Sequence, residues 1–132
     1  MTGSQMVTLV LDDRPLRLMV ATTWSARRRG LAYRAYADWS GYDGLLLHFP
    51  FRWYWPVWMV GMQFPIQLYW CVGSRVIATS RPLDPGHPWA LHWPPQAVDR
   101  IIELMRPPDA VDGAASGWSA PSRLRPAPKT AR

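Results

Sequence analysis

The stretch Phe64-Pro65-Ile66-Gln67-Leu68-Tyr69-Trp70-Cys71-Val72-Gly73-Ser74-Arg75-Val76-Ile77-Ala78-Thr79-Ser80 decides the fold class of this chain. Its apolar side chains recur at every second position from Phe64 to Val72, which is the period of a β-strand with one buried face. Gly73-Ser74 matches a two-residue hairpin turn that starts with glycine, and Arg75–Ser80 then returns as the partner strand. The stretch therefore predicts a β-hairpin.

Outside this hairpin, short apolar runs are separated by proline, glycine and aspartate, which are residues that end strands and form turns. Further strands are predicted over residues 7–11, 16–21, 45–49, 57–61 and 89–93, the first two joined as a hairpin by the turn at 12–15. One short helix is expected from Trp24 to Gly30 or to about Tyr36, and a second from Pro94-Pro95 to Met105. The predicted fold class is mainly β, a small β-sandwich or barrel with two short helices.

The length of 132 residues and the hydrophobic fraction of 48% fit one domain with its own core. We expect a single β-rich domain over residues 1–111 and a disordered, basic tail rich in proline, alanine and serine over 112–132. The net charge is +6, but four of the fifteen basic residues lie in the last eleven positions. The predicted domain is therefore only mildly basic.

A membrane location is not favoured, although the stretch Trp53–Ser74 contains no charged residue and is long enough to span a bilayer. Its two prolines and two glutamines would leave polar groups unpaired in lipid, so no membrane span is expected. The first residues lack the pattern of an export signal, which favours a cytoplasmic location. Cys71 is the single cysteine, so an internal disulfide is excluded and a buried thiol is expected.

Three motifs in this order resemble one bacterial and archaeal family, domain of unknown function 192. The first motif is Arg29-Gly30-Leu31, and the second is Gly44 followed by an apolar run that ends at Phe49. The third and most specific motif contains Trp58-Met59 and Pro65-Ile66, followed by the hairpin quoted above. The resemblance covers about residues 16–111. It implies a compact β-sandwich or barrel with jelly-roll-like connections, and the activity of the family is not established.

This chain departs from the family at the polar positions of the third motif. Where the family usually has lysine, asparagine, threonine and aspartate, this chain has Val60, Gly61, Met62 and Gln67. If those polar groups form a site in relatives, that site is degenerate here.

The corner Phe51-Arg52-Trp53-Tyr54-Trp55, with Trp58 close by, has more large rings than one strand can bury. Some of these rings must be exposed, and clusters of exposed Trp and Tyr are typical of binding surfaces. The predicted binding surface consists of Arg52, Trp53, Tyr54, Trp55 and Trp58. The favoured function is a non-catalytic binding or accessory module for a protein or polymer partner, with no cofactor and no catalytic residue assigned.

An alternative function is a metal-dependent or hydrolytic enzyme that uses His48, His92 and Asp84, because imidazole binds zinc, copper or iron. The histidines lack the spacing of a ligand pair on one hairpin or helix, so no metal site is predicted. Asp99 and Glu103 would lie one turn apart on the solvent face of the second helix and repel each other.

A second alternative is weak nucleic-acid binding through Arg27, Arg34 and the basic tail. Three consecutive arginines, Arg27-Arg28-Arg29, spread around a helix and cannot all face one row of phosphates, so nucleic acid is not the favoured partner. Arg29 and Arg34 match basic positions of the family, which indicates a weak anion site near Gly30.

Overall fold

The computed structural model describes residues 5–107 and 123–126. In chain order the elements are β1 (Gln5–Leu11), β2 (Arg14–Ala21), α1 (Trp24–Arg29), the 3-10 helix η1 (Tyr36–Trp39), β3 (Gly44–Trp53), β4 (Val57–Trp58), β5 (Ile66–Val72), β6 (Arg75–Thr79), β7 (Leu91–His92), β8 (Val98–Met105) and β9 (Leu124–Pro126). The predicted mainly β class is confirmed.

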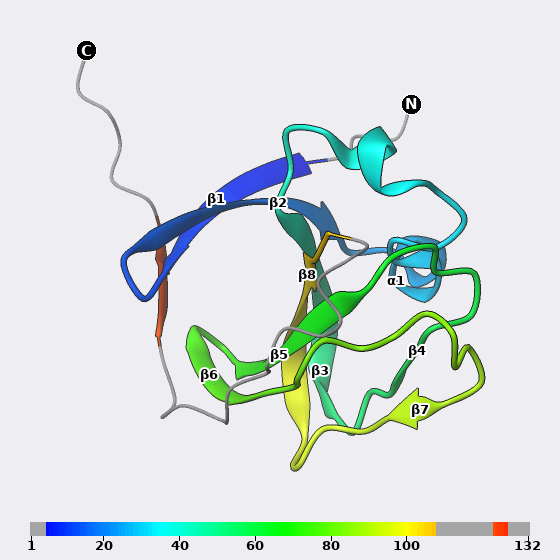
Figure 1. Cartoon of the computed structure of the whole chain (residues 1–132). Coiled ribbons are helices and arrows are strands. Elements are labelled where there is room, and N and C mark those ends of the chain that lie inside the picture. Colours follow the sequence, from blue (N-terminus) through cyan, green and yellow to red (C-terminus); the bar gives the residue numbers. More distant parts are fainter. Residues whose placement is uncertain (1–4, 108–122, 127–132) are drawn as a thin grey trace.

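One large sheet holds most of these strands, in the order β6-β5-β8-β3-β2-β1-β9. β2 and β3 are parallel, and all other neighbours in this sheet are antiparallel. Because parallel neighbours need a crossover, the chain between them leaves the sheet and carries α1 and η1. The sheet curls into a half-barrel, and the separate pair β4-β7 lies at the same end of the molecule as α1 (Figure 1).

The two predicted hairpins are present. The pairing of Val72 with Arg75 leaves Gly73-Ser74 as the turn between β5 and β6, with φ of 58° at Gly73. The turn between β1 and β2 consists of Asp12 and Asp13, which both have positive φ, and Asp is one of the few side chains that tolerate this conformation.

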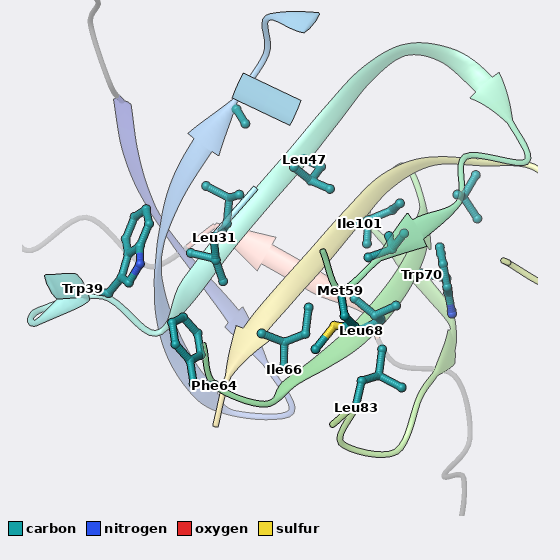
Figure 2. Close-up of a cluster of buried hydrophobic side chains, with 14 residues drawn as sticks. Leu31, Trp39, Leu47, Met59, Phe64, Ile66, Leu68, Trp70, Leu83 and Ile101 are labelled. Atoms are coloured by element: carbon teal, nitrogen blue, oxygen red, sulfur yellow. The ribbon is translucent and has the colours of Figure 1, made fainter. Parts of the chain in front are cut away.

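The core forms on both faces of the central strands. On one face, Ile66, Leu68 and Trp70 of β5 pack in a cluster with buried side chains of β3 and β8, and Figure 2 shows Leu47 and Ile101 directed into it. The alternate residue Cys71 packs on the other face, in a cluster with Leu16, Leu18 and Ile102. β8 lies between β5 and β3, and its side chains are buried on both faces, Ile101 in the first cluster and Ile102 in the second.

The predicted second helix, from Pro94-Pro95 to Met105, is wrong. Val98–Met105 forms β8, a central strand whose side chains are buried on both faces. The spacing of Val98, Ile101 and Ile102 fits a helical stripe, but a strand buried on both faces also has a nearly continuous apolar run. The β-branched side chains of these three residues favour the strand.

The shorter of the two predicted ends of the first helix is confirmed, because α1 ends at Arg29 and Gly30 is its C-cap. Three other details differ from the prediction. β3 continues past Pro50 to Trp53, while the strands predicted over 57–61 and 89–93 are reduced to the two-residue strands β4 and β7. Within the tail predicted as disordered, Leu124–Pro126 pairs with β1 as β9. Arg123, just before it, forms an isolated bridge with Arg75, and the rest of that tail lies outside the described residues.

No helix among the described residues has the length and apolar character needed to cross a membrane. The uncharged stretch Trp53–Ser74 contains the last residue of β3, all of β4 and β5, and the hairpin turn.

Candidate functional site

A pocket of about 440 Å³ lies between α1, the aromatic corner at the end of β3, and the β4-β7 pair. Small-molecule sites in proteins usually have volumes of about 300–1,000 Å³ and mainly apolar walls. The walls of this pocket include five aromatic side chains, which are Trp24, Phe49, Trp53, Trp55 and Trp58. The pocket is therefore the candidate functional site.

An irregularity in the pairing of β3 with β8 produces the aromatic corner. His48 pairs with Arg100 and Trp53 pairs with Val98, so five steps along β3 match only two along β8. The extra residues bulge out of the sheet, and such bulges redirect side chains near sites. Trp53, at the end of this bulge, and Trp55, just after it, line the pocket.

Trp55 fixes the inner part of this corner. Its ring stacks on Phe49 at 4.5 Å between ring centroids and 8° between planes. Its Nε1 also donates a hydrogen bond to the Phe51 carbonyl at 3.1 Å. Trp55 is thus held by the protein itself, while Trp53 and Tyr54 of the corner are exposed.

The structure brings together three of the five residues predicted as a binding surface. Trp53 (57% exposed), Trp55 and Trp58 (41% exposed) line the pocket. Tyr54 is exposed with its ring against that of Trp53 at 6.0 Å, but it does not line the pocket. Arg52 is exposed and is also outside the lining.

Three arginines of α1 supply the positive charge of the pocket. Arg27 is held in place, since its Nη1 donates to the carbonyls of Thr22 and, at 3.0 Å, His48, and its guanidinium lies 5.3 Å from the centroid of the Phe49 ring. Arg28 and Arg29 are exposed. The pocket therefore combines apolar walls with two solvent-exposed cations.

Arg34 is not part of this arrangement. Its guanidinium lies 5.3 Å from the centroid of the Trp39 ring, and it does not line the pocket. Because α1 ends at Arg29, Arg34 lies outside the helix that carries Arg27. The structure thus places Arg29 at the pocket without Arg34.

Glu103 is the functional candidate that the sequence did not reveal. It lines the pocket from β8 and is only 5% exposed, between Leu45 of β3 and Leu68 of β5. Burial raises the pKa of its carboxyl from 4.5 to about 7, while a hydrogen bond from the Leu31 backbone N–H acts in the opposite direction. Once 98–105 is read as a strand, a single acid in the run Ile101-Ile102-Glu103-Leu104-Met105 is a signal for a buried charge.

Gly30 allows the chain to pass directly over this carboxyl. Its φ is 55°, and a Cβ at this position would lie 2.9 Å from Glu103 Oε1. A side chain here would meet both an unfavourable backbone conformation and the carboxyl oxygen. This contact explains the motif Arg29-Gly30-Leu31. Gly30 lets the chain pass close to the Glu103 carboxyl, and the Leu31 backbone N–H donates a hydrogen bond to that carboxyl.

We expect Gly30→Ala to lower the free energy of unfolding by about 1–3 kcal/mol, the cost of a strained backbone conformation, and to perturb the pocket. Gly73→Ala is the matched control, because Gly73 also has positive φ but no atom within 4 Å of a Cβ. Chemical denaturation of both variants measures the difference. An equal loss in both would contradict a close approach of Gly30 to Glu103.

The four positions where this chain departs from the family do not gather in one place. Val60 lines the pocket. Gly61 lies under Tyr33, whose ring is 2.6 Å from where a Cβ would be, and its carbonyl accepts the Tyr33 N–H at 2.7 Å. Met62 packs on the core, and Gln67 alternates with Ile66 and Leu68 on β5 and so faces the other side of the sheet.

The residues of the predicted metal or hydrolytic alternative are scattered. His48 is exposed on β3, and His92 lies on β7, where burial and then the charge of Arg81 lower its pKa. The Asp84 carboxylate accepts the Gly86 N–H at 2.8 Å and so stabilises its own turn. Across residues 5–107 and 123–126, no group of three or more His, Cys, Asp and Glu side chains could hold a metal ion. The structure therefore gives this alternative no support.

Cys71 is buried, as predicted, and lies outside the pocket. Burial raises the pKa of its thiol to about 12, although Arg100 acts in the opposite direction. Since the thiolate is the reactive form, we expect Ellman's reagent to label Cys71 only as the protein unfolds. Labelling within minutes in native buffer, at the rate measured in denaturant, would contradict this.

The comparisons with known proteins agree with the resemblance seen in the motifs. The family model of DUF192, described as an uncharacterized ACR, matches residues 7–107. The chain belongs to this family. In this DUF192 protein the matched range includes every residue of the pocket lining. No curated protein matches the chain.

Two solved structures share the fold of this DUF192 protein. One is a "putative transcription regulator" from Sinorhizobium meliloti 1021, with a TM-score of 0.72, 19% identity, and coverage of 96% of this chain and 97% of that chain. The other is a protein of unknown function from Novosphingobium aromaticivorans DSM 12444, with a TM-score of 0.69, 14% identity, and coverage of 94% and 87%. At these identities the likeness concerns the fold alone.

Proposed function

We propose that this DUF192 protein is a non-catalytic binding module, and that its site is the pocket between α1 and the aromatic corner. The observation that carries the proposal is the concentration of five aromatic side chains and three arginines around one pocket of about 440 Å³. Exposed aromatic rings in a concave site bind flat apolar groups by stacking. A volume of this size fits a small molecule better than the broad contact with a protein or polymer expected from the sequence.

The charges around the pocket favour an anionic ligand. Arg28 and Arg29 are exposed at the pocket, and the ion pair found in the described part of the chain, Arg125 with Asp13, involves neither of them. The guanidinium group binds carboxylates in a planar, two-pronged geometry. The ligand chemistry that fits best is therefore a flat aromatic group that carries a carboxylate.

The test uses 1-naphthaleneacetate as a probe, with binding measured by isothermal titration calorimetry. We expect binding to wild type, and an affinity about tenfold lower for Trp53→Ala and for Trp58→Ala, because stacking on one aromatic side chain contributes about 1–3 kcal/mol. Trp89→Ala is the matched control, since Trp89 is 76% exposed and does not line the pocket. Absence of binding, or the same loss in the control, would overturn the proposal.

A further inference from the structure

A carboxyl group at the pocket has no charged partner within the described residues. Glu103 lies among apolar neighbours, since Leu45, Leu68 and Ile101 belong to one core cluster on the same face of the sheet. No arginine of the pocket forms an ion pair with it, and burial dominates the change in its pKa. Such a group is costly to bury without a partner, so its position requires an explanation.

One oxygen of this carboxyl is unsatisfied. The Leu31 backbone N–H donates to the carboxyl, while the buried Oε1 has no hydrogen-bond partner in the structure. Glu103 and Gly30, which lies against Oε1, both line the pocket, and a buried acceptor without a donor is a place where a ligand donor gains affinity.

We infer that Glu103 is a ligand-binding residue, and that it recognises an N–H or O–H donor on the ring of the bound molecule through Oε1. This inference rests on the proposed function of the pocket and makes it more specific. The exposed Arg28 and Arg29 bind the carboxylate of the ligand, the indole rings of Trp53 and Trp58 stack on its flat body, and the Glu103 oxygen accepts its ring donor. The ligand class is an aromatic acid with a donor on the ring, such as an indole carboxylate.

A purely structural role for Glu103 would concern only the loop at Gly30. The Leu31 N–H uses one oxygen, and a glutamine would still accept that hydrogen bond while presenting an NH₂ group in place of the second oxygen. A structural role therefore predicts no difference between ligands with and without a ring donor. A recognition role predicts that Glu103→Gln affects only the ligand that carries the donor.

The experiment compares indole-3-acetate, which has a ring N–H, with 1-naphthaleneacetate, which has a similar shape and no ring donor. By calorimetry we expect wild type to bind indole-3-acetate about tenfold more tightly, which corresponds to one hydrogen bond to a charged or buried group. Glu103→Gln is expected to reduce the preference to within about twofold. Asp99→Asn is the control, because Asp99 lies on the same strand, accepts the Gly73 N–H at 2.8 Å and does not line the pocket.

The outcomes separate the two proposals. If neither acid binds, the proposed function of the pocket is wrong. The inference about Glu103 is overturned if both acids bind wild type equally, or if Glu103→Gln keeps the full preference for indole-3-acetate. In either case the pocket binds aromatic acids, but Glu103 does not recognise the ring donor. The comparison in wild type needs no variant and decides the question even if Glu103→Gln folds poorly.

Discussion

Replacing Gly44 with alanine is expected to destabilise the protein by about 3 kcal/mol or more, the upper end of the cost of overpacking a core. Gly44 begins β3 opposite Leu104 of β8. A Cβ there would lie 2.1 Å from the Glu103 carbonyl oxygen and 3.0 Å from the Leu104 Cα. Both atoms belong to the backbone of the central strand, so no side chain can rotate to relieve the clash. The two strands would have to move apart.

Urea denaturation of Gly44→Ala, followed by fluorescence, measures this loss. Gly86→Ala is the matched control, because the closest atom to a Cβ there is the end of the Asp84 side chain at 3.3 Å. We expect the control to change the free energy of unfolding by less than about 0.5 kcal/mol, as for most surface substitutions. A Gly44→Ala protein as stable as the control would mean that β3 and β8 are less closely packed than described.

The second large effect concerns the dependence of stability on pH. Burial raises the pKa of Glu103 from 4.5 in the unfolded chain to about 7 in the folded protein. Between these two values the folded protein binds a proton that the unfolded chain has released, so stability falls as the pH rises. The stabilisation is fully present below pH 4.5 and is lost by about pH 7. The total is about 3 kcal/mol, since each pKa unit corresponds to about 1.4 kcal/mol.

Comparison with Glu103→Gln isolates this contribution from those of the other acidic groups. The free energy of unfolding, measured from pH 4.5 to about 7, should decrease more steeply in wild type than in the variant. The stability of the variant relative to wild type should therefore increase as the pH rises from 4.5 to about 7. Parallel curves would show that the Glu103 carboxyl has an ordinary pKa, and that it is not buried as described.

Local patterns were enough to predict the hairpins and the β class. The alternation from Phe64 to Val72 and the Gly73-Ser74 turn depend on neighbouring residues only, and the structure confirms both. The excess of rings after Phe51 also predicted correctly that some of them are exposed. Strand alternation, a two-residue turn and an excess of rings are each determined by residues that are neighbours in the sequence, so each can be recognised from a short segment.

The pocket and its buried acid could not be predicted in the same way. The arginines of α1 reach the aromatic corner because β2 and β3 pair in parallel and the crossover places α1 there. The burial of Glu103 depends on β8 lying between β3 and β5, while its local pattern also fits a helix with an exposed acid. Pairing between distant strands decided between these two readings, and the spacing of apolar residues does not encode that pairing.

The pairing of β9 with β1 has a consequence for self-association. An edge strand offers free backbone donors and acceptors to any other extended chain, and proteins cover such edges to avoid aggregation. In this protein Leu124–Pro126 pairs with Leu9–Leu11 of β1. Leu124 is also buried, in the core cluster that contains Leu11. The C-terminal segment thus covers this part of the edge of β1. Truncation of the chain before Leu124 would leave the backbone groups of Leu9–Leu11 free to pair with a second molecule.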